Sequence, residues 1–131
     1  RATKENSIDK IINLGIKKHK IIYSGNKKNI REYVNVKDAA KMAVKTLGKK
    51  YANKHIQITG NKKTSVIKAL KIIKKELAIN SKIIFKNKKN EGHYINSPEN
   101  YKIKKTSKIY LRHSTPFNLG IREIIQNKIK W

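Results

Sequence analysis

The sequence has 131 residues, of which 37% are hydrophobic, and a formal net charge of +25 at pH 7. This length is usual for one domain with its own core, and the hydrophobic share argues against a wholly disordered chain. The lack of cysteine excludes disulfides and thiolate metal sites. No apolar run approaches the roughly 18 residues that span a bilayer. A cytoplasmic protein without membrane contact is therefore expected.

The strong positive charge has two interpretations. A basic chain favours a polyanionic partner such as nucleic acid. Drift toward A/T-rich codons is the other interpretation, because 22 Ile, 29 Lys and 14 Asn make about half of the chain, although drift alone does not explain why only eight acids occur. The basic residues are 29 Lys against 4 Arg, spread along the chain, whereas base recognition favours Arg. We favour drift and keep a basic nucleic-acid-binding module as the alternative.

Apolar spacing near the N-terminus predicts one helix and two strands. The helix is expected from Ser7 to Leu14, with Gly15 as its left-handed cap. A strand is expected from Ile21 to Ser24 and a second from Ile30 to Val36, with a glycine turn between them. Alternation along the second strand places three polar or aromatic side chains on one face: Arg31, Tyr33 and Asn35.

The middle of the chain predicts two amphipathic helices separated by a strand. The first helix is expected to run to about Gly48 and to bury one apolar stripe, made of Val36, Ala40, Ala43, Val44 and Leu47. The strand is expected over His55–Thr59, followed by a turn at Gly60–Lys63. The second helix is expected to start at a cap provided by Thr64 or Ser65 and to end near Leu77.

The last third of the chain predicts one further strand and one further helix. The strand is expected at Lys82–Phe85, and no element is predicted over residues 87–108. The helix is expected from about Gly120 to Lys130, with four side chains inward: Ile121, Ile124, Ile125 and Ile129. Alternating helices and strands predict an α/β fold, which we place in one segment over residues 1–131.

Catalytic, metal and cofactor sites are not predicted in this chain. The four His are far apart in sequence, and the six Gly are too widely separated to build a phosphate-binding loop. Tyr-x-x-x-Lys occurs three times, beginning at Tyr23, Tyr33 and Tyr101, but none of the three has both groups on a predicted helix face. We therefore treat the three matches as coincidence.

One segment carries a more specific pattern. Residues 25–40 read Gly-Asn-Lys-Lys-Asn-Ile-Arg-Glu-Tyr-Val-Asn-Val-Lys-Asp-Ala-Ala. This segment resembles the Gly-x-x-x-x-x-Arg-[Asp/Glu]-[Tyr/Phe]-[Ile/Val]-x-Val-x-Asp-x-Ala signature of the NAD-dependent epimerases and dehydratases, which are extended short-chain dehydrogenases. In that family the signature lies in the C-terminal part, after the cofactor domain. The resemblance covers about Arg1 to Phe85, and the strand, glycine turn and helix start over residues 56–66 also fit it.

The resemblance implies a role for several residues. Arg31 matches the arginine that binds the nucleotide diphosphate, for which a guanidinium offers a bidentate fork. Lys88 or Lys89 lies near the position of a second phosphate-binding arginine, and each is otherwise a surface lysine. Tyr33 is either a sugar contact or a packing residue, and Arg31 is otherwise a solvated strand residue. Asp38 is implied to be structural, at the start of a helix.

The same resemblance implies the substrate-binding portion of an enzyme whose Rossmann cofactor half is absent from this chain. The expected partners are a nucleoside-diphosphate sugar and that missing half, encoded in the same gene or separately. NAD(P) is implied as the cofactor of the intact enzyme. The chain starts with Arg1 rather than Met, so an upstream segment is expected. The chain alone is predicted to be inactive, and a truncated product without a ligand remains a further alternative.

Overall fold

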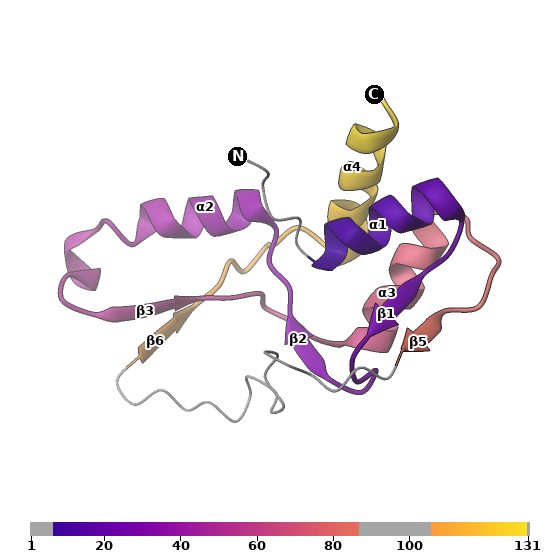
Figure 1. The fold of residues 1–131 in the computed structure, drawn as a ribbon. Helices are drawn as coiled ribbons and strands as arrows, with labels where there is room; N and C mark the ends of the chain where they lie inside the picture. Colours follow the sequence, from indigo (N-terminus) through magenta and orange to yellow (C-terminus); the bar gives the residue numbers. More distant parts are fainter. Residues whose placement is uncertain (1–6, 87–105, 131) are drawn as a thin grey trace, which may run out of the picture.

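The computed structural model describes residues 7–86 and 106–130. Helices and strands alternate along these residues, as the α/β prediction requires (Figure 1). In chain order the elements are α1 (Ser7–Lys18), β1 (Ile22–Ser24), β2 (Ile30–Glu32), α2 (Val36–Lys45), the 3-10 turn η1 (Lys49–Tyr51), β3 (His55–Ile58), β4 (Lys63–Ser65), α3 (Val66–Glu76), β5 (Ile84–Lys86), β6 (Thr106–Ile109) and α4 (Phe117–Ile129).

The strands form three separate two-stranded sheets among the described residues. β1 pairs with β5 and β3 pairs with β6, both in parallel, whereas β2 and β4 are antiparallel. Parallel partners must come from distant parts of the sequence, because the chain has to cross over between them. The two parallel pairs therefore join the N-terminal half of the chain to its C-terminal half.

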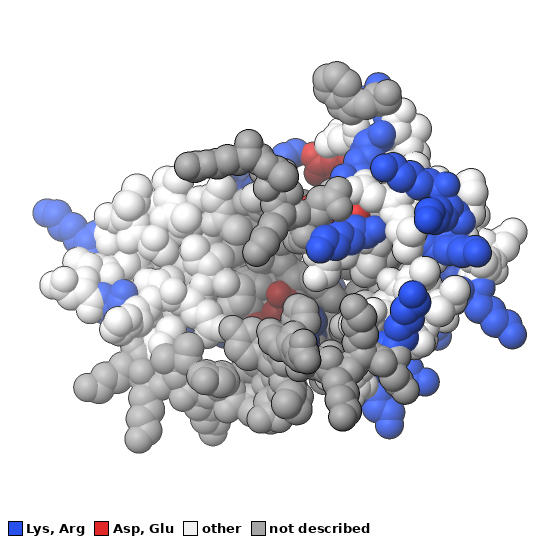
Figure 2. Space-filling model, viewed as in Figure 1, with Lys and Arg blue, Asp and Glu red and all other residues white. Residues whose placement is uncertain are grey.

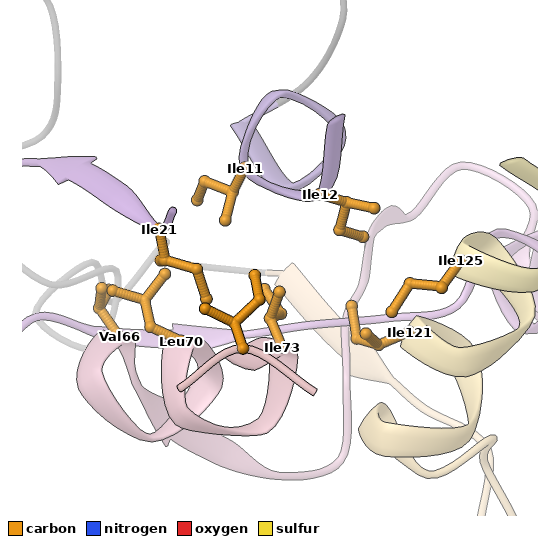
Figure 3. Close-up of a cluster of buried hydrophobic side chains, with 9 residues drawn as sticks. Ile11, Ile12, Ile21, Val66, Leu70, Ile73, Ile121 and Ile125 are labelled. Atoms are coloured by element: carbon orange, nitrogen blue, oxygen red, sulfur yellow. The ribbon is translucent and has the colours of Figure 1, made fainter. Parts of the chain in front are cut away.

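A hydrophobic core lies between α1, α3 and α4, with the start of β1 beside them (Figure 3). Seven of its nine buried side chains are isoleucine, and Ile12 at 0% exposure is the most deeply buried. Burying a side chain of this size stabilises a fold by roughly 1.5–3 kcal/mol. The nine core residues are Ile11, Ile12, Ile21, Val66, Leu70, Ile73, Ile79, Ile121 and Ile125.

The end of α1 differs from the sequence prediction. Gly15 is not a cap, because it is buried inside a helix that continues to Lys18. A Cβ atom at Gly15 would lie 2.5 Å from Cδ1 of Leu77, so glycine lets α1 and the chain after α3 approach closely. The left-handed position is taken by His19, whose φ is 50°. The helix therefore ends one turn later than predicted.

The chain between β2 and α2 also corrects the prediction. β2 ends at Glu32 and does not extend to Val36, because Val36 is the first residue of α2. Asn35 is the N-cap of that helix, and its side-chain oxygen accepts a hydrogen bond from the Lys37 N–H at 2.8 Å. The segment 33–35 is therefore the connection between strand and helix.

The predicted buried stripe of α2 is wrong. Val36, Val44 and Leu47 are 79%, 68% and 84% exposed, and Ala40 and Ala43 are exposed as well. The buried side chains of α2 are instead Asp38 and Met42. The helix thus turns its aliphatic stripe away from the described part of this chain.

The second half of the chain follows the prediction in part. Ser65 is the N-cap of α3, as predicted, and its hydroxyl accepts from the Lys68 N–H. β4 and β6 were not predicted, and α4 begins three residues before the predicted Gly120. Ile129 is 65% exposed and does not point inward. None of the helices in the described ranges has the length and apolar character to cross a membrane.

Candidate functional site

A cavity of about 960 Å³ opens where the ends of β2 and β3 meet the segment that leads into α4. Pockets for small organic ligands typically have volumes of about 300–1,000 Å³, so this space can hold a large ligand. Its walls come from four parts of the chain that are distant in sequence, within residues 8–9, 33–42, 59–72 and 111–127. The residues that concern us are Tyr33, Asn35, Thr59, Gly60, Arg112, Thr115 and Phe117.

Tyr33 forms part of the cavity wall. Its ring lies against Phe117 with 4.8 Å between the ring centroids and an interplanar angle of 41°. Burial raises the pKa of Tyr33 above its usual value of 10.0, the nearby Tyr23 adds to the rise, and the charge of Arg31 opposes it. Tyr33 therefore packs against Phe117 and also lines the cavity, and it lies close to Arg31.

Arg31 lies in the middle of β2, opposite Thr64 of β4. Its side chain is half-buried, and one guanidinium nitrogen donates to the Ile30 carbonyl oxygen at 3.0 Å. Across residues 7–86 and 106–130, no carboxylate forms an ion pair with this guanidinium. Arg31 is close enough to influence Tyr33 but is not part of the cavity wall. Within the described ranges, the hydrogen bond of this guanidinium goes to the Ile30 carbonyl oxygen.

Gly60 brings the ends of β2 and β3 together. A Cβ atom added to Gly60 would lie 2.0 Å from the Tyr33 carbonyl oxygen and 2.8 Å from its carbonyl carbon. No other residue fits there unless the backbone moves. The glycine turn after β3 is therefore what allows Tyr33 and Thr59 to share one cavity.

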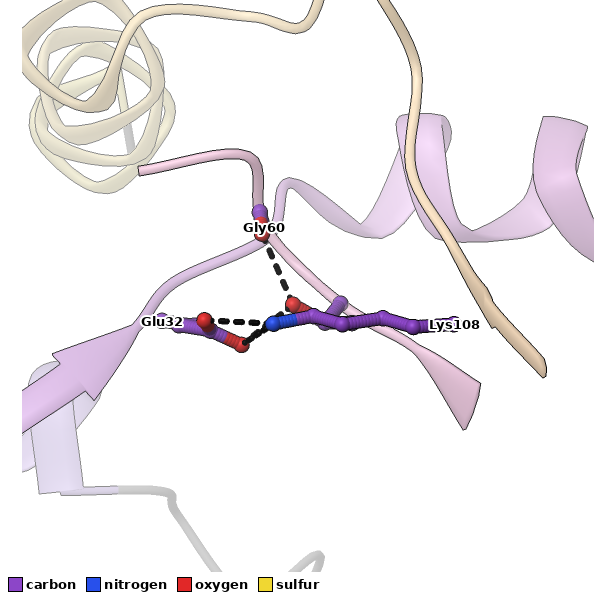
Figure 4. A network of polar contacts seen from close by, with 4 residues as sticks. Glu32, Gly60 and Lys108 are labelled. Carbon is purple, nitrogen blue, oxygen red and sulfur yellow. Dashed lines mark hydrogen bonds and ion pairs between the residues drawn. The ribbon is translucent and has the colours of Figure 1, made fainter. Parts of the chain in front are cut away.

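A polar network joins β2, β3 and β6 beside this glycine (Figure 4). Lys108 Nζ donates to both carboxylate oxygens of Glu32, at 2.6 and 2.8 Å. The buried Thr59 hydroxyl donates to the same carboxylate at 2.6 Å and lies 2.7 Å from the Gly60 carbonyl oxygen. Burial of Glu32 alone would raise its pKa, but these hydrogen bonds and the charges of Lys108 and Lys63 outweigh burial and lower it.

The lowered pKa of Glu32 predicts loss of stability in acid. A folded-state pKa below the ordinary 4.5 means that the unfolded chain binds the proton more readily. The ionised Glu32 carboxylate stabilises the fold fully above about pH 4.5, and this stabilisation disappears as the pH falls through the folded-state pKa. We expect a contribution of about 1 kcal/mol, measured by urea unfolding between pH 3 and pH 7. Glu32→Gln and Lys108→Met should both flatten this pH dependence, and an unchanged slope in either variant would contradict the assignment.

Asp38 ties α2 to the segment before α4. It is 3% exposed, and its carboxylate accepts a hydrogen bond from the Thr115 N–H at 2.6 Å. Lys37, one residue earlier, forms an ion pair with Glu123 of α4. The capping role at the start of α2 belongs to Asn35, so Asp38 acts across the fold and not only on its own helix. These contacts hold one wall of the cavity in place.

Basic side chains outnumber acidic ones around the cavity. The acidic side chains in its wall are Asp9 and Glu123, and Glu123 already pairs with Lys37. Many of the exposed Lys and Arg visible in Figure 2 lie over the side of the molecule formed by α1 and α3. The local excess favours an anionic ligand. The basic residues in the wall are Lys37, Lys62, Lys68, Arg112 and His113.

The two predicted lysine ligands, Lys88 and Lys89, lie outside the described residues. The sequence interpretation also missed several residues that form the site. Thr59 and Thr115 line the cavity, and Lys108 fixes Glu32, but no local pattern marks any of the three. Only Gly60 carried a signal, because a glycine directly after a predicted strand indicates a tight turn.

The glycines of the described ranges do not fit a dinucleotide site. Such a site needs several glycines in one turn between a strand and a helix, where the backbone cradles the diphosphate. Gly15 and Gly120 lie inside helices, and Gly25, Gly48 and Gly60 lie in three different connections. These residues therefore provide no such turn. Within the same ranges no three His, Asp or Glu side chains gather in a group that could hold a metal ion.

Comparison with known proteins identifies relatives of the fold. No protein-family model and no curated protein matches the sequence. The structure is similar to a GDP-L-fucose synthetase from Naegleria fowleri, with a TM-score of 0.71 and 18% identity over 97% of this chain and 41% of that one. It is also similar to a GDP-D-glycero-L-gluco-heptose synthase from Campylobacter jejuni, crystallised with NADPH, with a TM-score of 0.57 and 17% identity.

The second similarity covers 91% of this chain and 35% of the Campylobacter protein. This chain therefore spans less than half of the length of either protein. At these identities the likeness establishes the fold alone. The chain has an α/β fold that corresponds to part of two larger proteins.

Proposed function

We propose that this chain is the sugar-nucleotide-binding part of an NAD(P)-dependent enzyme of the epimerase and dehydratase type. In this proposal it forms the C-terminal part of an extended short-chain dehydrogenase fold. The part that binds the cofactor is a separate body, in the same polypeptide or another. Both structural relatives bear the names of enzymes that make GDP-linked sugars. This agrees with the signature at residues 25–40.

One observation carries the proposal: the half-buried Arg31 lies opposite Thr64 of the cavity wall and has no carboxylate partner in the described ranges. A guanidinium held on a strand offers two parallel N–H donors, which suit a phosphate better than an ammonium group does. In this proposal the diphosphate binds at Arg31, on the same side of the chain as Tyr33. The sugar then occupies the cavity next to the Tyr33 ring.

The cavity supports the proposal through its size and its charge. A volume of about 960 Å³ suits a nucleoside-diphosphate sugar, and the excess of basic side chains offsets the two phosphate charges. Asp38 has a structural role in this scheme, because it holds the segment at Thr115 that forms one wall. Lys88 and Lys89 stay proposed as additional phosphate contacts.

Titration calorimetry with GDP-mannose and UDP-glucose tests the proposal. We expect one of the two to bind, and Arg31→Ala to weaken that binding about thirtyfold, equivalent to about 2 kcal/mol. The affinity of Arg31→Lys should lie between those of the wild type and Arg31→Ala, because lysine keeps the charge but lacks the two parallel N–H donors of arginine. Arg122→Ala is the matched control, since Arg122 is an exposed arginine that already pairs with Glu76.

Two results would overturn the proposal. The first is equal affinity in the wild type and Arg31→Ala, and the second is no binding of either sugar nucleotide to the wild-type chain. The proposal also requires that the chain alone does not convert a sugar nucleotide. Measurable conversion of a GDP-hexose or UDP-hexose with NADPH or NAD⁺ would contradict the two-part arrangement.

A further inference from the structure

The exposed lysines of this chain are not spread evenly over its helices. All three exposed residues of α3 are lysine, namely Lys68, Lys71 and Lys75, and three of the four exposed residues of α1 are lysine as well. In α4 only one of the six exposed residues is basic, and this residue, Arg122, already pairs with Glu76. Codon drift accounts for the number of lysines in the chain but not for this difference between helices.

The ends of α1 and α3 meet at one corner of the molecule. A Cβ atom at Gly15 of α1 would lie 2.5 Å from Cδ1 of Leu77, which directly follows α3, so the two helix ends lie close together. Figure 2 shows Lys and Arg side chains gathered over these helices, at the right of the view. We call the exposed lysines at the two helix ends, and just before the strands that follow them, the basic corner: Lys17, Lys18, Lys20, Lys75 and Lys82.

Two lysines of the basic corner lie on neighbouring stretches of backbone. The carbonyl oxygen of the residue before Lys20 accepts a hydrogen bond from the Ser81 hydroxyl at 2.9 Å. The carbonyl oxygen of the residue after it, Ile21, accepts one from the Ile84 N–H, also at 2.9 Å. These two bonds hold Lys20 beside Lys82. Adjacent stretches bonded in this way are about 4.8 Å apart, and like charges placed opposite each other across them destabilise the fold.

Local contacts do not account for all of this charge. Within residues 7–86 and 106–130, no ion pair joins a lysine of the basic corner to a carboxylate. Glu76 is close enough for the charge of Lys75 to lower its pKa, but its ion pair is with Arg122. Lysines in the last turns of α1 and α3 also offset the negative ends of the helix dipoles. Lys20 and Lys82 lie beyond both helices, so the dipoles do not explain them.

The composition of the basic corner restricts the kind of anion that fits it. All five members are lysine, whereas the recognition of base edges and the anchoring of acidic proteins favour Arg. The exposed Tyr in the described ranges, Tyr110, follows β6, so the corner lacks a ring on which single-stranded bases stack. Its apolar neighbour is Ile84, 41% exposed, and stable attachment to a membrane needs more apolar burial than one such side chain provides. Duplex phosphates require only cations near the backbone.

We propose that the basic corner binds the phosphate backbone of a nucleic-acid duplex without regard to base sequence. The site is separate from the sugar-nucleotide cavity, because none of the five lysines lines that cavity. This inference therefore does not depend on the proposed function. Phosphates next to Lys20 and Lys82 relieve the repulsion between the two ammonium groups. Each lysine that meets a phosphate also releases a counterion, so the affinity falls steeply as the salt concentration rises.

Fluorescence anisotropy with labelled DNA and RNA duplexes tests this inference. A chain with a net charge of +25 attracts polyanions wherever its lysines lie, so the test compares two variants of equal charge. Lys20→Gln/Lys82→Gln changes the basic corner, and the matched control, Lys41→Gln/Lys54→Gln, changes two exposed lysines in α2 and just before β3. At about 0.1 M salt we expect the first variant to lose about tenfold or more in affinity for duplex DNA. The slope of log affinity against log salt should fall by about 1.8, and the control should change neither quantity appreciably.

Equal losses in the two variants would overturn the inference, because binding would then follow the net charge and not the basic corner. No measurable binding of either duplex would overturn it as well. Tighter binding to vesicles of phosphatidylcholine and phosphatidylserine at about 2:1 than to both duplexes would assign the corner to a membrane surface instead.

Thermal unfolding provides an independent readout. Lys20→Gln/Lys82→Gln should keep or raise the unfolding midpoint, because the substitutions remove the repulsion between neighbouring charges. A lower midpoint would show that the two lysines support the fold and would contradict their assignment to a ligand. Neither result affects the sugar-nucleotide titration, so the two proposals can be rejected separately.

Discussion

Replacing Gly60 with alanine is expected to destabilise the fold by about 3 kcal/mol or more. The added methyl group would lie 2.0 Å from the Tyr33 carbonyl oxygen, well inside van der Waals contact. The obstacle is backbone and not the flexible end of a side chain, so relief requires the ends of β2 and β3 to separate. Separation would also weaken the hydrogen bond from Thr59 to Glu32.

Urea unfolding followed by circular dichroism measures the loss at Gly60. Gly48→Ala is the matched control, because a Cβ there would meet its nearest atom, the Lys45 carbonyl oxygen, at an ordinary 3.6 Å. We expect that variant to stay within about 1 kcal/mol of the wild type. Equal midpoints for Gly60→Ala and Gly48→Ala would show that the two strand ends do not approach as described.

Replacing Asp38 with alanine is expected to destabilise the fold by about 3 kcal/mol. The carboxylate is almost fully buried, and it accepts the hydrogen bond of the Thr115 N–H. Its removal leaves that N–H without its partner and leaves a small void next to it, and both effects cost stability. The loss should be largest in the segment 111–116, which forms one wall of the cavity.

Amide hydrogen exchange at Thr115, together with urea unfolding, checks this expectation. Asp38→Asn serves as the control, because the amide keeps one acceptor oxygen in nearly the same volume. We expect this variant to lose about 1 kcal/mol and to retain most of the protection of the Thr115 amide. Unchanged protection in Asp38→Ala would show that another group holds this segment.

The sequence predicted those elements that local signals determine. Ser65 caps α3 because its hydroxyl can accept a backbone N–H, and this preference is visible without any tertiary contact. The burial of Leu70 and Ile73 follows from helical spacing. Helix periodicity is reliable where one face of a helix is covered by the same chain.

Periodicity failed at α2 because it shows that a face is apolar, not which body covers it. The spacing of Val36, Val44 and Leu47 is as regular as that of the α3 core residues, yet these three are exposed. The strand β6 was missed for a different reason. Its short polar segment, Thr106–Ile109, is a strand only because β3 lies beside it, and pairing between distant segments leaves no local signature.

The residues of the candidate site also differ in whether a local sequence pattern predicts their positions. Strand alternation predicted one shared face for Arg31, Tyr33 and Asn35, but β2 ends at Glu32, so Tyr33 and Asn35 lie in the connection to α2. Arg31 is still close enough to Tyr33 to influence its pKa. The partners from elsewhere, Thr59, Lys108 and Thr115, meet these residues only after folding. Their positions depend on the Gly60 approach and on the parallel pairing of β3 with β6, which a single sequence does not specify.

The isoleucine-rich core has a consequence for how this chain tolerates its skewed composition. Seven of nine core residues are isoleucine, and lysine is the most numerous residue overall. Both have A/T-rich codons, but isoleucine accumulates inside while lysine accumulates in contact with water. Isoleucine is also stiff about its first side-chain torsion, so a nearly uniform interior still has a defined shape. Drift toward A/T-rich codons can therefore add isoleucine to the core and lysine to the surface at the same time, because the two residues occupy different positions.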